Sequence, residues 1–102
     1  MCYNNIMKTV FTNGCFDILH RGHLEYLKES AFWGERLIVG INSDSSIRKL
    51  KGSDRPINKE EDRKLALECL RFVDRVYIFD EPTPYELIKY IRPDIITKGG
   101  DY

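Results

Sequence analysis

The sequence lacks the features of a disulfide scaffold, a zinc site and a membrane protein. Its 102 residues contain only three cysteines, Cys2, Cys15 and Cys69, which are widely spaced and form no C-x-x-C pair. Neither a disulfide framework nor a zinc site is therefore predicted. No apolar run approaches the roughly 20 residues of a membrane-spanning helix, and the first seven residues do not have the pattern of a signal peptide. We expect a cytoplasmic protein with reduced thiols and no membrane segment.

The chain also lacks an excess of charge of either sign. Sixteen basic and sixteen acidic residues give a formal net charge of zero. No overall field would attract nucleic acid or an anionic membrane, so neither partner is expected, and any anion must be bound by locally placed groups. A content of 42% apolar and 31% charged residues is typical of a globular protein, and the length suits one domain.

Strand-like and helix-like segments alternate along the sequence. Runs rich in β-branched and aromatic residues predict strands at residues 8–12, 36–41, 75–79 and 95–98. Helices are predicted from Gly22 to the stop at Gly34, within residues 42–55, from Asn58, and from Thr83 to about Ile91. Asn58 and Thr83 each precede a glutamate by three residues, which predicts two capping boxes. This alternation predicts a Rossmann-like, doubly wound parallel α/β sheet.

Polar clusters follow each predicted strand. In a parallel sheet of this kind, ligands bind beyond the carboxyl ends of the strands. The clusters after the first and fourth strands contain Gly14 and Gly99-Gly100, which permit close approach of a ligand to the backbone. Neither a G-x-G-x-x-G turn nor a P-loop is present.

The sharpest local signal is His20-Arg21-Gly22-His23, at the start of the first predicted helix. Two imidazoles at a helix N-terminus favour an anion such as a phosphate in transfer, and Gly22 keeps the turn between them open. A helix-capping histidine beside a surface histidine explains the same four residues equally well. A metal site made by His20, His23 and Cys15 lacks an evident fourth ligand and is not expected.

Arg63 occupies the apolar face of the third predicted helix, in its first turn. A cation there requires an anionic partner. That partner is either a ligand, which we favour, or a carboxylate of Asp62, Asp80 or Glu81. The side chain could also extend to water.

The segment 47–56 is basic and contains a glycine. Such a charge run is usually a solvated face. A mobile basic flap over a polyphosphate is the alternative, and Lys51 is then the preferred contact.

Five segments together resemble one known superfamily. They are T-N-G-C-F-D-I-L-H-R-G-H at 12–23, R-L-I-V-G-I-N-S-D at 36–44, R-K-L-K-G-S-D-R-P at 48–56, D-R at 62–63 and K-G-G-D-Y at 98–102. The resemblance is to the cytidylyltransferase-like nucleotidyltransferase superfamily. Within it, the nucleotidyltransferase domains of ADP-heptose synthases, the heptose 1-phosphate adenylyltransferases, are the most similar.

The resemblance implies a three-layer α/β/α nucleotidyltransferase fold and a reaction. AMP would move from ATP to heptose 1-phosphate, with release of pyrophosphate, in lipopolysaccharide precursor synthesis. Mg²⁺ normally accompanies the triphosphate, no metal-ligating residue is implied, and a homodimer is plausible. Glycerol-3-phosphate cytidylyltransferase, which uses CTP, is the nearest enzymatic alternative.

The resemblance also implies roles for individual residues. His20 and His23 would stabilise the charge on the α-phosphate, Lys51 and Arg63 would hold phosphates, and Asp17 would orient its loop. The remaining implied residues line the nucleotide pocket: Phe11, Thr12, Asn13, Gly14, Cys15, Phe16, Gly22, Lys98, Gly99, Gly100 and Asp101.

Members of the superfamily continue past the end of this sequence, into a Ser/Thr-rich motif that contacts the nucleotide phosphates. We therefore expect residues 1–102 to form a single domain that lacks its C-terminal segment. A catalytically incomplete nucleotide-binding module is the non-enzymatic alternative.

Overall fold

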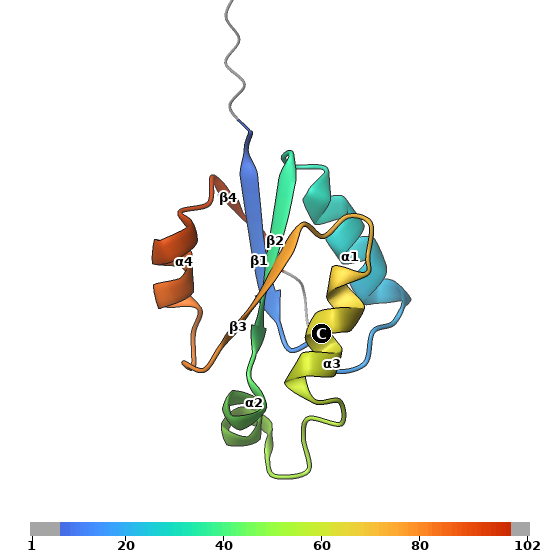
Figure 1. The fold of residues 1–102 in the computed structure, drawn as a ribbon, viewed down its shortest axis with the longest axis vertical. Coiled ribbons are helices and arrows are strands. Elements are labelled where there is room, and N and C mark those ends of the chain that lie inside the picture. The colour runs from blue at the N-terminus through green and yellow to red at the C-terminus, as the bar shows by residue number, and fades with distance from the viewer. Residues whose placement is uncertain (1–6, 99–102) are drawn as a thin grey trace, which may run out of the picture.

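The computed structural model describes residues 7–98, which form a parallel four-stranded sheet with helices on both faces (Figure 1). The elements are β1 (Thr9–Gly14), α1 (Arg21–Ala31), β2 (Arg36–Asn42), α2 (Asp44–Lys51), α3 (Glu60–Glu68), β3 (Arg75–Phe79), α4 (Tyr85–Ile91) and β4 (Ile95–Ile96). The predicted fold class is confirmed. None of the helices in residues 7–98 combines the length and the apolar character needed to cross a membrane.

The strand order is β3-β2-β1-β4, and every neighbouring pair is parallel. The chain winds outward from β1 through β2 to β3 and then returns to place β4 on the other side of β1. The direction of winding therefore reverses between β1 and β4. In sheets of this class, that reversal opens a crevice at the carboxyl ends of the two strands, where ligands bind.

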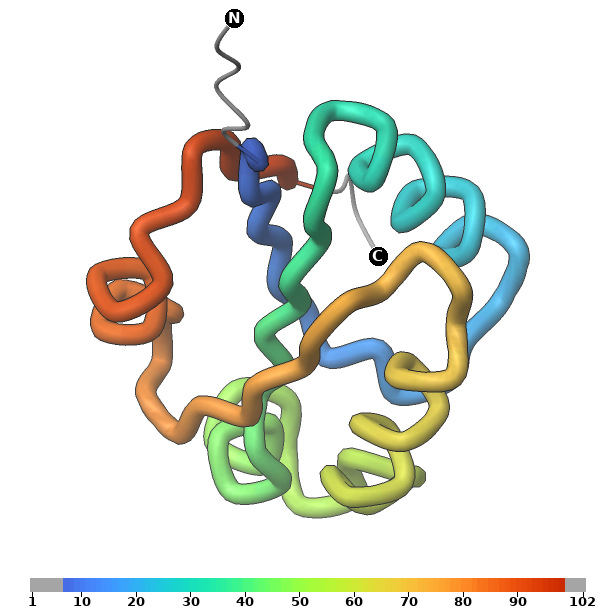
Figure 2. The backbone as a smooth tube through the Cα atoms, turned by 45° about the horizontal axis from the view of Figure 1, so that its top comes forward, coloured from blue at the N-terminus to red at the C-terminus, as the bar shows by residue number. Residues whose placement is uncertain are grey.

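Two layers of helices enclose the sheet. Helices α1 and α3 cover one face and α4 covers the other (Figures 1 and 2). Strand β2 is buried along almost its whole length, as a parallel strand covered on both faces should be. The main apolar core joins the sheet to α1 and α3 and contains Val10, Phe16, Leu27, Leu37, Val39, Ile41, Leu67, Val73 and Val76.

Both predicted capping boxes are wrong. Helix α3 begins after Lys59, which makes no capping bond with its side chain. Asn58 instead donates its side-chain N–H to the Asp17 carbonyl and its backbone N–H to the Asp17 carboxylate. A contact with a distant loop therefore replaces the local cap. Helix α4 begins after Pro84, again without a side-chain cap, so Thr83 does not fill that position.

Candidate functional site

A cavity of about 470 Å³ opens at the carboxyl edge of the sheet, beside the reversal between β1 and β4. That volume is in the range of small-molecule sites. The walls come from the β1–α1 loop, the first turns of α1, the end of β2, the α2 region and Lys98. The lining residues are Asn13, Gly14, Cys15, Phe16, Asp17, Ile18, His20, His23, Tyr26, Asn42, Lys51, Arg55 and Lys98.

His20 is the N-cap residue of α1 and also lines the cavity. Its Nδ1 accepts a hydrogen bond from the backbone N–H of Gly22 at 3.0 Å. Its own backbone N–H donates to Nδ1 of His23 at 3.3 Å, so the two histidines cap the helix reciprocally. Because Nδ1 of His20 is an acceptor, the neutral ring carries its proton on Nε2. His20 thus caps the helix with one ring nitrogen and keeps a donor on the other.

Gly22 provides the space that the His20 ring occupies. A Cβ at Gly22 would lie 2.9 Å from Cε1 of His20, closer than real side chains approach. Gly22 does not line the cavity itself. Its contribution is to let the imidazole fold back over the first turn of the helix.

The two imidazoles lie against each other, with ring centroids 4.0 Å apart. His23 is the inner ring; it is buried and meets the edge of Phe16. Burial lowers the pKa of His23, and the neighbouring His20 lowers that pKa further, while a hydrogen bond with the Ile18 backbone opposes both effects. His23 is therefore a neutral imidazole at neutral pH.

The lowered pKa of His23 makes the stability of the protein depend on pH. The unfolded chain takes up a proton near the ordinary value of 6.5, whereas the folded chain resists protonation at this site. The contribution of His23 is therefore complete above that value, and it is lost as the pH falls toward the lowered folded pKa.

We expect the free energy of unfolding in urea to fall between about pH 7.5 and pH 5.5, and to fall less in His23→Gln. Since the sequence has only two histidines, imidazole NMR resonances report each one separately. Titration of the His23 ring at or above the ordinary value of 6.5 would contradict the assignment.

The cavity is cationic among its described lining residues. Lys51, Arg55 and Lys98 contribute three positive charges, and Asp17 contributes the single carboxylate. That carboxylate accepts hydrogen bonds from the backbone N–H groups of Ile57 and Asn58, both at 2.8 Å, and it lies 3.9 Å from Arg55. Asp17 is thus engaged in fixing the loop before α3. The remaining charge and the N-terminus of α1 favour an anionic ligand.

Arg63 lies beneath the cavity with its side chain 1% exposed. Its guanidinium pairs with Asp44 at 2.8 Å and donates to three backbone carbonyls, those of Cys15, Asn42 and Asn58, at 2.8–2.9 Å. The prediction that Arg63 faces the interior is confirmed. Its carboxylate partner is Asp44 and none of the three carboxylates expected from the sequence. Arg63 also joins the β1–α1 loop, through Cys15, to the end of β2, through Asn42, and both of those residues line the cavity.

The structure brings many, but not all, of the predicted site residues together. Those at the cavity are Asn13, Gly14, Cys15, Phe16, His20, His23, Lys51 and Lys98, whereas Phe11, Thr12, Gly22 and Arg63 do not line it. Phe11 and Thr12 are fully buried within β1, upstream of its carboxyl end. The predicted residues Gly99, Gly100 and Asp101 lie outside the described residues. The roles of all these residues remain predictions.

Sequence reasoning missed Tyr26 as a wall of the cavity. Its signal was present, because Tyr26 follows His23 by three residues and so lies on the same face of α1.

A doubly wound sheet, a cationic cavity at its strand-order reversal and a histidine pair at a helix N-terminus together define an α/β domain suited to binding an anionic ligand. Comparison with known proteins agrees with this class. The cytidylyltransferase-like family model matches residues 11–102, and the chain belongs to that family.

Known proteins resemble this chain both in sequence and in structure. The chain is similar to bifunctional proteins HldE of Wolinella succinogenes (62% identity) and Aliarcobacter butzleri (60% identity), with 93% of the chain aligned in each case. It spans about one fifth of the length of these curated relatives. The crystal structure of the lipopolysaccharide core biosynthesis protein from Thermoplasma volcanium GSS1 is also similar, at 39% identity with a TM-score of 0.81, covering 88% of this chain and 72% of that one.

Proposed function

We propose that this domain transfers AMP from ATP to heptose 1-phosphate and releases pyrophosphate. The observation that carries the proposal is the position of His20, whose Nδ1 caps α1 while the residue lines a cationic cavity at the strand-order reversal, which leaves Nε2 to donate to a ligand. The similarity to HldE proteins and to a lipopolysaccharide core biosynthesis protein supports the choice of acceptor. The reaction would take place in the cytoplasm, where ATP is available.

The chemistry is an in-line displacement at phosphorus. An oxygen of the acceptor's phosphate attacks the α-phosphorus of ATP, forming a new P–O bond. The bond between the α-phosphorus and the oxygen bridging to the β-phosphate breaks, and pyrophosphate leaves with those electrons. No covalent enzyme intermediate is needed, so the protein acts by positioning and by stabilising charge.

In this mechanism His20 donates from Nε2 to an α-phosphate oxygen as negative charge develops there. The inner ring of His23 is neutral and receives the His20 backbone N–H, which fixes the first turn of α1. Lys51, Arg55 and Lys98 would neutralise the β- and γ-phosphates. The glycine-bearing backbone at Asn13 and Gly14 would accept close approach of the nucleotide.

Mg²⁺ would arrive with the triphosphate and offset part of its charge. Within residues 7–98, no group of three or more His, Cys, Asp or Glu side chains is placed to hold a metal ion. The carboxylate of Asp17, which is nearest to the site, is already bonded to two backbone N–H groups. These side chains do not form a metal cage, and no step above is assigned to the metal.

Pyrophosphate release tests the proposal directly. The protein is assayed with ATP and with CTP, each against heptose 1-phosphate and glycerol 3-phosphate. We expect turnover with ATP and heptose 1-phosphate. Turnover with CTP and glycerol 3-phosphate alone would replace the proposal with a glycerol-3-phosphate cytidylyltransferase. ATP binding by calorimetry without turnover on either acceptor would indicate a binding module.

A further inference from the structure

Four hydroxyl groups form a connected cluster between α1 and the sheet. Oγ1 of Thr12, in β1, is hydrogen-bonded to the Tyr26 hydroxyl. The Tyr26 hydroxyl lies 3.1 Å from Oγ1 of Thr97, and Oγ of Ser30 lies 2.9 Å from that same atom. Thr12 also bonds the Thr97 carbonyl at 3.2 Å. Thr12 and Ser30 are almost completely buried, so these bonds form away from bulk water.

The contacts define one direction of donation. A carbonyl oxygen only accepts, so the single proton of Thr12 points to the Thr97 carbonyl. Tyr26 must then donate to Thr12, the Thr97 hydroxyl must donate to Tyr26, and Ser30 must donate to Thr97. Every hydroxyl in the cluster uses its proton once. Tyr26 is the link from α1 to both strands, because its hydroxyl donates to Thr12 of β1 and accepts from Thr97, which follows β4.

The cluster fixes Thr97, which immediately precedes Lys98. The backbone N–H of Thr97 donates to the Phe11 carbonyl at 3.0 Å, extending the ladder between β1 and β4. With its hydroxyl and its carbonyl held as well, Thr97 is restrained by all three of its polar groups. Lys98 then enters the cavity from a strand end whose position is set by α1, the helix that carries His20 and His23.

We propose that Tyr26 is a positioning residue of the transferase site. Its hydroxyl fixes the position of the strand end that carries Lys98 relative to the helix that carries the histidine pair. The inference rests on the proposed function and extends it, because it assigns to Tyr26 control over a cation that holds the nucleotide phosphates. Displacement of such a group by a fraction of an ångström weakens a phosphate contact made in both the ground state and the transition state.

Tyr26→Phe removes the hydroxyl and keeps the ring. We expect the KM for ATP to rise about five- to tenfold, the effect of one lost hydrogen bond, with kcat nearly unchanged. Thr97→Val, which removes the donor to Tyr26 and keeps the branched shape, is expected to give the same shift, and the double variant is expected to add little. Tyr90→Phe is the control, because Tyr90 is 74% exposed on α4; its KM should not change.

Dependence on Lys98 separates positioning from a merely structural role. In a Lys98→Met background, Tyr26→Phe should change the KM for ATP less than about twofold, because the group that it positions is gone. A full effect of Tyr26→Phe in that background, or a KM within twofold of wild type for both Tyr26→Phe and Thr97→Val, would overturn the inference. A wild-type protein that neither binds nor transfers a nucleotide would overturn the proposed function itself. The two failures are distinguishable, because the KM comparison is made only in a protein whose wild type is active.

Discussion

Replacing His20 with asparagine is expected to lower kcat for nucleotidyl transfer about 100-fold or more, the typical cost of losing a donor to developing charge. Asparagine is among the best N-cap residues, so it can accept the Gly22 N–H that Nδ1 of His20 accepts in the structure. The helix cap is thereby retained while the Nε2 donor is lost. Steady-state kinetics with ATP, together with the ATP dissociation constant from calorimetry, measure the effect.

His20→Ala is the matched variant, because it removes the cap and the donor together. It should lose the same activity and, in addition, about 1 kcal/mol of unfolding free energy. If His20→Asn keeps kcat within about tenfold of wild type, the imidazole only caps the helix and the proposed role in charge stabilisation is wrong.

Arg63→Met is expected to have the largest effect on stability, a loss of about 3–5 kcal/mol in the free energy of unfolding. The change removes the partner of Asp44 and the donor to three backbone carbonyls, in a place where the guanidinium is 1% exposed. Urea unfolding followed by circular dichroism measures this loss. A loss below about 1 kcal/mol would contradict the buried network.

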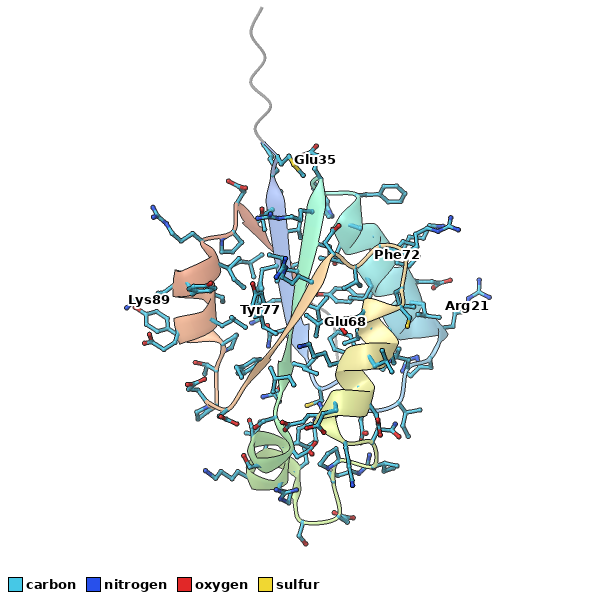
Figure 3. The ribbon with its side chains drawn as sticks, in the orientation of Figure 1. Arg21, Glu35, Glu68, Phe72, Tyr77 and Lys89 are labelled. Carbon is cyan, nitrogen blue, oxygen red and sulfur yellow. The ribbon has the colours of Figure 1, made fainter. Side chains whose placement is uncertain are left out.

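Arg21→Met is the control for Arg63→Met. Arg21 pairs with Glu25 at the same distance of 2.8 Å, but its side chain is 88% exposed and extends into solvent (Figure 3). Exposed pairs of this kind contribute little, so the change should stay within about 0.5 kcal/mol. The comparison separates a buried ion pair with its three carbonyl bonds from an exposed ion pair of the same length.

The same pair of variants also tests the phosphate-holding role that family resemblance predicts for Arg63. A guanidinium that served mainly the nucleotide would show its loss in the ATP dissociation constant, with little change in unfolding free energy. A guanidinium that mainly holds its neighbouring backbone segments together would show its loss in the unfolding free energy, with little change in the ATP dissociation constant.

The fold was predictable because its signals are local and repeated. Each strand is a short β-branched or aromatic run, and the alternation with helices restricts the topology to a doubly wound sheet. The capping boxes failed because a sequence pattern describes only neighbours along the chain. Asn58 contacts Asp17, 41 residues away, and that bond replaces the local cap.

The candidate site was partly predictable for a related reason. The rule that ligands bind beyond the strand ends selects the segments of His20 and Lys98 without knowledge of side-chain directions, and the basic run 47–56 supplies Lys51. The partner of Arg63 was not predictable, because Asp44 and Arg63 meet only after α2 and α3 pack beside β2. The buried hydroxyl cluster around Tyr26 likewise depends on the register of β4, which a two-residue strand does not reveal in a sequence.

The central claim is that a nucleoside triphosphate binds at the carboxyl ends of β1 and β4. Titrating ATP with Mg²⁺ into the isotopically labelled protein, while following backbone and imidazole NMR resonances, tests it most directly. The predicted result is saturable shifts at His20, Gly14 and Lys98, with no change near Glu35 and Phe72, which border a separate cavity (Figure 3). Shifts confined to Glu35 and Phe72, with unmoved imidazole signals, would contradict it.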